Sequence, residues 1–155
     1  MTHPTTVVEQ IRKYFAYLFD DYDFDVISDT HFQNFGNWVV VLQSNDCRIR
    51  FFQDRGEVSV AVGPLWSPPG WQAGPWFDLT VITAFLTQGK STVEYESGKT
   101  ERQLKRLANI LRPYCDQICE LFQEKVFQQK RVELELLRDQ LDEQFWGQLT
   151  RRTQD

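Results

Sequence analysis

Three strand-like segments, followed by a loop rich in tryptophan and proline, constrain this chain most. The segment Trp38–Leu42 is apolar and largely β-branched, which predicts a strand buried on both faces. Cys47–Phe51 and Glu57–Val62 alternate with a period of two, and Asp54–Gly56 between them suits a tight hairpin loop. We therefore expect an antiparallel meander with one buried face.

The loop Gly63–Trp76 contains four prolines and three glycines, which argue against regular secondary structure. It also carries Trp66, Trp71 and Trp76, whose indole rings bring more apolar area than a loop commonly hides. One interpretation is that the rings cover the open edge of the core. The other is that one or two rings stay exposed and form a partner-binding patch.

An acidic segment precedes the strands. Asp21, Asp23 and Asp25 alternate with apolar residues, so a strand there would place the three carboxylates on one face. A calcium loop counted from Asp21 would need glycine and glutamate where the chain has Val26 and Phe32, so we expect no metal site. The two remaining interpretations are a solvated acidic face and an electrostatic docking surface.

The charge balance narrows the class of partner. The formal net charge is −5 and the isoelectric point is about 5.1. A nucleic-acid-binding domain normally presents a basic surface, so we expect no nucleic-acid partner. The acidic excess is compatible with a basic protein partner.

Helical patterns flank the strands. Thr5 or Thr6 is the expected N-cap of an amphipathic helix that continues to about Phe19. Asp78 is the expected N-cap of a second helix, which Gly89 ends.

This order of elements predicts an α+β fold. We expect a small antiparallel β-sheet, with the N-terminal helix and long C-terminal helices packed on one face. The chain is expected to form a single domain over residues 1–155, with an α+β core in about 1–99 and a helical segment in about 100–148.

The C-terminal third has two stretches in which apolar residues recur at helical spacing, and each is called a seam below. Thr100 and Gln103 match a capping box before the first seam, and Pro113 predicts a kink or break within it. The second seam has helical spacing and consists of Leu134, Leu137, Leu141 and Phe145. Three destinations are open for it: the protein's own sheet, the same seam of a second copy in a homodimer, or another protein.

No catalytic motif stands out. Cys115 and Cys119 share one helix face, but two thiols alone make a weak zinc site, so we interpret them as buried structural cysteines. The only histidines are His3 and His31, and the sequence has no nucleophile elbow, zinc-protease motif or phosphate-binding glycine loop. We predict no catalytic residue, no metal and no cofactor, and whether the protein is an enzyme stays uncertain, leaning to no.

The expected compartment is the cytoplasm. Three cysteines, an odd number, argue against a disulfide scaffold and for a reducing environment. The N-terminus lacks the features of a secretory signal, and no apolar run is long enough to cross a bilayer, so we expect no membrane association.

The segment from Tyr14 to Val62 resembles small uncharacterised bacterial α+β proteins, some of them similar to immunity proteins of polymorphic toxin systems. The resemblance lies in FGNWVVVLQSNDCRIRFFQDRGEVSVAVG, and its most specific part is the hairpin RIRFFQDRGEVSV. It implies a protein that inhibits a toxin by binding it. It transfers no functional residue to this chain.

We therefore predict a cytoplasmic, non-catalytic protein-interaction module, with an immunity-type inhibitor as one version. The first alternative is a small-molecule-binding protein or enzyme with an aromatic pocket under the tryptophan loop. The second is a structural homodimer formed through the C-terminal helix. The candidate partner-binding residues are Trp66, Trp71, Trp76, Asp21, Asp23, Asp25, Leu134, Leu137, Leu141 and Phe145.

Overall fold

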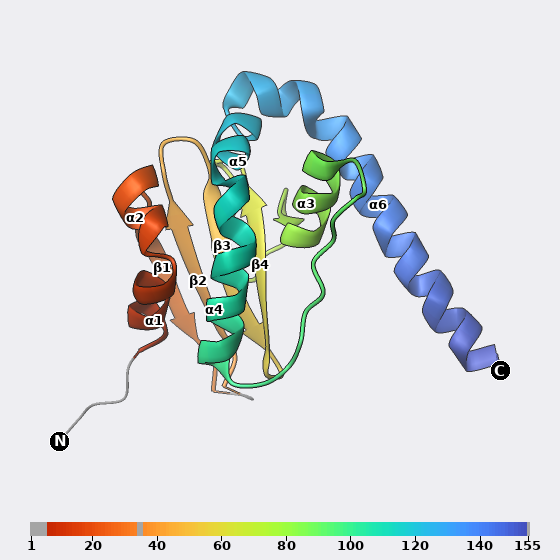
Figure 1. The fold of residues 1–155 in the computed structure, drawn as a ribbon, viewed down its shortest axis with the longest axis horizontal. Coiled ribbons are helices and arrows are strands. Elements are labelled where there is room, and N and C mark those ends of the chain that lie inside the picture. The colour runs from red at the N-terminus through yellow and green to blue at the C-terminus, as the bar shows by residue number, and fades with distance from the viewer. Residues whose placement is uncertain (1–5, 34–35, 155) are drawn as a thin grey trace.

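The computed structural model describes residues 6–33 and 36–154, and of residues 145–154 it describes the helical backbone alone. It confirms the α+β prediction, because the chain forms a five-stranded antiparallel sheet together with an N-terminal helical segment and long C-terminal helices (Figure 1). The strands lie side by side in chain order as β1 (Asp25–His31), β2 (Trp38–Gln43), β3 (Arg48–Asp54), β4 (Glu57–Gly63) and β5 (Phe77–Asp78). The helices are α1 (Val7–Tyr14), α2 (Ala16–Tyr22), α3 (Leu79–Thr87), α4 (Thr100–Leu111), the 3₁₀ turn η1 (Arg112–Tyr114), α5 (Cys115–Leu121) and α6 (Glu124–Gln154).

The predicted hairpin between β3 and β4 closes through a two-residue loop. Arg55 and Gly56 both have positive φ, 53° and 83°, and Asp54 pairs with Glu57 across the turn. Two positive φ values are the signature of a type I′ turn, whose twist matches that of the flanking strands. The turn therefore sets the register that sends alternate β3 and β4 side chains to the same face.

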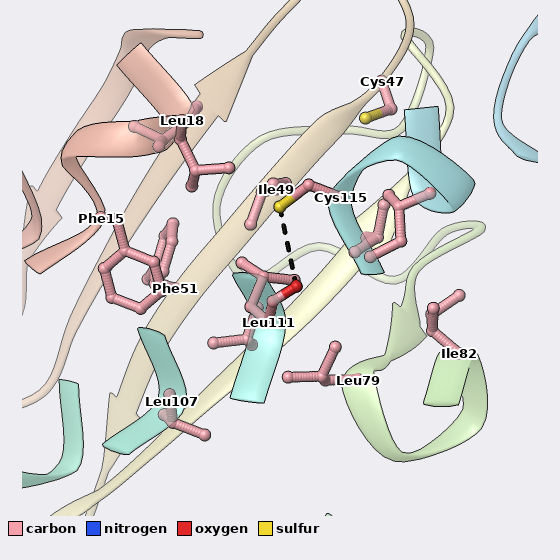
Figure 2. Packing of buried hydrophobic residues seen from close by; sticks show 14 of the residues in the cluster. Phe15, Leu18, Cys47, Ile49, Phe51, Leu79, Ile82, Leu107, Leu111 and Cys115 are labelled. Atoms are coloured by element: carbon pink, nitrogen blue, oxygen red, sulfur yellow. Dashed lines mark hydrogen bonds between the residues drawn. The ribbon is translucent and has the colours of Figure 1, made fainter. Parts of the chain in front are cut away.

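One face of the sheet carries the main core. Ile49, Phe51 and Val60 point into it and are at most 1% exposed. Helices α1, α2, α4 and α5 lie over this face (Figure 1), and the Phe15 ring packs edge-on against Phe51 with centroids 4.7 Å apart (Figure 2). The predicted packing of helices on one sheet face is thereby confirmed.

The opposite face is covered by the loop 64–76 instead of by helices. Val39, Val41 and Ala61 form a smaller buried cluster with Trp76, which the loop brings onto the strands. Strand β2 is therefore buried on both faces, as its sequence predicts. The expectation that the meander buries only one face is wrong, because the loop supplies a second apolar cover.

Two arginines of β3 hold this loop in place. The Arg48 Nη1 donates to the carbonyl of Ser67 at 2.6 Å, and the Arg50 Nη1 donates to the carbonyl of Gly70 at 3.1 Å. A loop without a hydrogen-bond ladder has carbonyls that need partners once they leave water. The guanidinium groups supply those partners from the strand side.

The N-terminal pattern forms two helices instead of one. Thr6, one of the two predicted N-caps, accepts a hydrogen bond from the Glu9 amide at 3.1 Å through its hydroxyl oxygen. The helix is interrupted at Phe15, whose fully buried ring packs on the sheet. Helix α2 then continues to Tyr22, whose hydroxyl donates to Asp116 of α5 at 2.7 Å.

The predicted acidic strand is wrong in its first half. Asp21 lies in α2, Asp23 is the C-cap of α2 with a left-handed φ of 58°, and Asp25 begins β1. Aspartate tolerates the left-handed region, so Asp23 can end a helix where strict alternation predicts a strand. Strand β1 then continues to His31, with a bulge in its pairing to β2 just before Ser28.

The predicted capping box is also wrong. Helix α4 begins at Thr100 itself, and the Thr100 hydroxyl donates to the Gln53 side chain of β3 at 2.6 Å. The buried Gln103 side chain donates to the Gly56 carbonyl at 2.7 Å and accepts from the Val58 amide at 2.8 Å. Both side chains therefore bind the β3–β4 hairpin, because α4 packs across it and its buried backbone groups need partners.

Two other helix boundaries agree with the sequence. Pro113 lies in the 3₁₀ turn η1, which breaks the helical run between α4 and α5. The Asp78 carboxylate accepts from the Thr80 amide at 2.8 Å and so caps α3, which ends before Gly89 with a φ of 82°. The last helix, α6, spans 31 residues, passes α3 and then runs away from the sheet (Figure 1).

Candidate functional site

The three loop tryptophans occupy three different environments. Trp76 is buried at 7% exposure on the loop-covered face of the sheet. Its Nε1 donates to the Pro68 carbonyl at 2.9 Å, and the Arg50 guanidinium lies 4.7 Å from its ring centroid. The first interpretation of the loop, that its rings cover the core, therefore describes Trp76.

Trp71 is intermediate between core and surface. Its side chain is 40% exposed, and its ring stands edge-on to Phe52 with centroids 5.1 Å apart. The ring centroid of Phe32, which follows β1, lies 6.0 Å from that of Trp71. Trp71 therefore extends the loop-covered cluster outward to the solvent.

Trp66 is the most exposed of the three, at 57%, and it lies at the junction of α5 and α6. Its ring stands edge-on to the buried Phe127 of α6 at 6.4 Å, and the Arg131 guanidinium lies 5.2 Å from its centroid. Arg131 is itself held by Glu135 at 2.8 Å. These contacts fix the orientation of an indole that still presents most of its area to water.

A groove of about 490 Å³ opens beside Trp66. Its apolar part includes the exposed Leu65 and the stacked rings of Phe122 and Phe127, whose centroids are 5.4 Å apart. Its charged and polar part comes from the β2–β3 turn and from the start of α6. The full lining is Asn45, Asp46, Pro64, Leu65, Trp66, Phe122, Gln123, Glu124, Phe127, Gln128 and Arg131.

The groove lining carries charges of both signs. Asp46 and Glu124 place two carboxylates at the groove, while Arg131 is occupied by Trp66 and Glu135. None of the side chains that line it is a histidine, cysteine, serine or lysine, so Asp46 and Glu124 are the lining groups able to accept or donate a proton near neutral pH. Within the described residues, no cluster of three or more His, Cys, Asp or Glu could hold a metal ion.

The acidic candidates lie elsewhere. Asp21, Asp23 and Asp25 are exposed at the end of α2 and the start of β1, and none of them lines the groove. The structure therefore does not bring them together with Trp66.

The second seam packs mainly on the protein itself. Leu134 is fully buried, and Leu137 and Leu141 are partly buried against the main core, while the side chain of Phe145 lies outside the described residues. These leucines pack within the same chain, where α6 lies beside helix α3. A homodimer through the C-terminal helix stays a prediction.

Sequence reasoning missed the residues that build the groove. Phe127 and Arg131 belong to a stretch that separates the two helical seams in the sequence, and neither belongs to either seam. Their role depends on contact with Trp66, some sixty positions away along the chain. The one local signal is the pair Phe122 and Phe127, two large apolar residues flanking the start of α6.

Within the described residues, no helix combines the length and the apolar character needed to cross a membrane. Comparison with protein-family models, with curated proteins and with solved structures finds no match to this chain. The resemblance to immunity proteins therefore stays a prediction.

Proposed function

We propose that the protein is a non-catalytic interaction module of the cytoplasm that binds a protein partner at the groove beside Trp66. The observation that carries this proposal is an indole that is 57% exposed yet oriented by Phe127 and Arg131. Tryptophan and arginine are enriched among the residues that dominate binding energy at protein interfaces. A side chain that is already oriented also loses less conformational entropy when a partner binds.

The groove lining suggests the chemistry of the partner. Leu65, Trp66 and Phe127 offer an apolar contact for one inserted side chain. Asp46 and Glu124 favour basic residues on either side of that side chain, and the net charge of −5 adds a long-range attraction. An immunity-type inhibitor of a basic toxin is the version of this proposal that agrees with the resemblance.

The groove volume supports a second candidate, a small-molecule-binding protein. Its 490 Å³ falls within the range of about 300–1,000 Å³ that is usual for ligand sites. The mixture of aromatic walls and two carboxylates would suit a cationic aromatic or aliphatic ligand. In this case the molecule that binds in the groove is a metabolite instead of a protein.

The test compares two exposed loop tryptophans. Affinity-tagged full-length protein is used to capture partners from native lysate, alongside Trp66→Ala and the matched control Trp71→Ala. We expect Trp66→Ala to weaken the binding of the partner by about 2 kcal/mol, which is roughly a 30-fold rise in Kd. Titration calorimetry with the identified partner measures this change. Trp71→Ala should bind like the wild type, because Trp71 lies on the loop-covered face of the sheet and not at the groove.

Two outcomes would reject the interaction site. One is a partner that binds Trp66→Ala as tightly as it binds the wild type, with both proteins unfolding at the same temperature. The other is that neither Asp46→Lys nor Glu124→Lys weakens the binding of any captured partner. A small molecule released from the denatured wild type, and absent from Trp66→Ala, would favour the second candidate.

A further inference from the structure

Strand β1 forms one outer edge of the sheet (Figure 1), and no strand in the described part of the chain pairs with its outer side. The strand has seven residues, and its last three, Asp29 to His31, are all exposed. The opposite outer strand, β5, has only two residues, and the side chain of its Asp78 caps α3. Strand β1 is therefore the edge with room for a further strand.

The hydrogen-bond pattern shows which backbone groups of β1 point outward. The Phe32 amide donates to the Asn37 carbonyl at 2.9 Å, and in the next pair His31 lies opposite Trp38. Along an antiparallel ladder, hydrogen-bonded pairs alternate with pairs that share no hydrogen bond. His31, and Asp29 two residues before it, belong to the second kind. Their backbone N–H and C=O groups therefore face away from β2.

The side chains along β1 differ between the two faces of the sheet. Asp29 lies opposite Val40 of the main core, so its carboxylate is on the helix-covered face, where its Oδ1 lies 2.9 Å from His31 Nε2. Phe32 is on the loop-covered face, where its ring contacts that of Trp71, and both side chains are 40% exposed. An added strand would thus meet a carboxylate on one face and apolar rings on the other.

The charge at this edge determines the charge of its ligand. Residues 20–31 contain no lysine or arginine, and all the aspartates among them are exposed: Asp20, Asp21, Asp23, Asp25 and Asp29. Opposite charges directly across two strands stabilise their pairing, whereas like charges destabilise it. A strand that brings lysine or arginine to this edge is therefore favoured over a neutral or acidic one.

We propose that β1 is a docking edge for an extended basic segment of a partner protein, which adds to the sheet as a sixth strand. The segment pairs its backbone with the outward N–H and C=O groups of Asp29 and His31. Its basic side chains lie beside Asp29, and the apolar side chains between them lie beside Phe32 and Trp71. In this mode of binding the main-chain hydrogen bonds supply affinity and the alternating side chains supply specificity.

The docking edge is separate from the groove beside Trp66. None of Asp29, His31, Phe32 and Trp71 lines the groove. The proposal therefore stands whether the groove binds a protein, a metabolite or nothing. A captured protein that is lost from Trp71→Ala but kept by Trp66→Ala belongs to the edge.

The test uses full-length protein and a synthetic heptapeptide in which lysine alternates with valine. Deuterium exchange of the backbone amides, followed by NMR, identifies the strand that the peptide joins. We expect the outward amides of Asp29 and His31 to exchange about tenfold more slowly when the peptide is bound. The control is the same peptide with backbone N-methyl groups on its lysines, which keeps the charges but removes the donors to β1. It should give no protection.

A charge reversal tests the contribution of the carboxylate. We expect Asp29→Lys to raise the Kd of the peptide by about tenfold, because a like charge replaces an opposite one across the strands. Asp139→Lys, at an exposed position of α6, makes the same change in net charge and should bind like the wild type. Trp66→Ala should also bind like the wild type. Circular dichroism and thermal unfolding establish that each variant is folded.

Four results would overturn the docking edge. The first is equal binding of the N-methylated peptide, since charge alone would then hold the ligand. The second is an equal loss of affinity in Asp29→Lys and Asp139→Lys. The third is a loss of binding in Trp66→Ala, which would place the peptide in the groove. The last is that millimolar peptide leaves the β1 amides unprotected.

Discussion

The two faces of the sheet are buried by different means. Helices satisfy their own backbone hydrogen bonds, so the helix-covered face is closed mainly by apolar contacts such as Phe15 against Phe51. The loop 64–76 lacks such a ladder, and its carbonyls take hydrogen bonds from Arg48 and Arg50. An irregular segment can thus close a sheet face when the strands beneath it carry charged donors.

Adjacent phenylalanines of β3 offer the strongest test of this contrast. Phe51 is fully buried under the helices, and Phe52 is half-buried under the loop. We expect Phe51→Ala to lower the free energy of unfolding by about 3–5 kcal/mol, and Phe52→Ala to lower it by about 1–2 kcal/mol. Urea unfolding followed by circular dichroism measures both. Equal losses would show that the two faces contribute equally to stability.

Removing one of the two β3 arginines that hold the loop should have a smaller and more local effect on stability. Arg48→Met keeps the aliphatic stem but removes the donor to the Ser67 carbonyl, so we expect a loss of about 1–2 kcal/mol. Cleavage by chymotrypsin at Trp66 and Trp71 should accelerate, because the loop opens more often. Arg55→Met, at the exposed β3–β4 turn, is the matched control and should leave the cleavage rate unchanged. A loop that stays equally protected in Arg48→Met would mean that apolar contacts alone hold it.

The smallest expected effect concerns Asp78, which lies opposite Ala61 in the sheet. Burial raises the pKa of Asp78 above its usual value of 3.8, against the hydrogen bonds from Thr80 and Tyr95 and the charge of Arg50. The folded state therefore holds this proton more tightly than the unfolded state does. The resulting stability is complete below about pH 3.8 and is lost as the pH rises through the folded pKa.

Asp78→Asn keeps an acceptor oxygen but has no proton to lose. We expect its free energy of unfolding, relative to wild type, to shift in favour of the variant as the pH rises from acid to neutral. Urea unfolding across that range measures the difference, and Asp54→Asn at the exposed end of β3 serves as the control. A difference that moves the other way would mean that the charges and hydrogen bonds around Asp78 outweigh its burial.

Much of the fold was predictable because its signals are local. Gly56 marks a turn, Asp78 a helix start and Pro113 a helix break, and each acts through its own backbone. Thr100 and Gln103 were misread because their side chains bind a hairpin that is distant in the sequence. A local motif fails when a tertiary partner competes for the same polar group.

The candidate site was less predictable than the fold. Trp66 and Trp76 each lie within two residues of a proline, yet Trp76 is buried and Trp66 is mostly exposed. What separates them is the path of the loop over the strands and the arrival of Phe127 from α6. Neither can be inferred from residue spacing, since both depend on how distant segments pack.

The acidic strand β1 has a consequence for how the protein behaves at high concentration. It is an outer strand of the sheet, and such edges are templates for strand addition between molecules, the first step of fibril growth. Asp25 and Asp29 are exposed on it, and the bulge before Ser28 interrupts its regular pairing. A second copy that aligned its own β1 there would bring like charges together on an irregular edge. We therefore expect these carboxylates to oppose the addition of a second copy's strand at this edge.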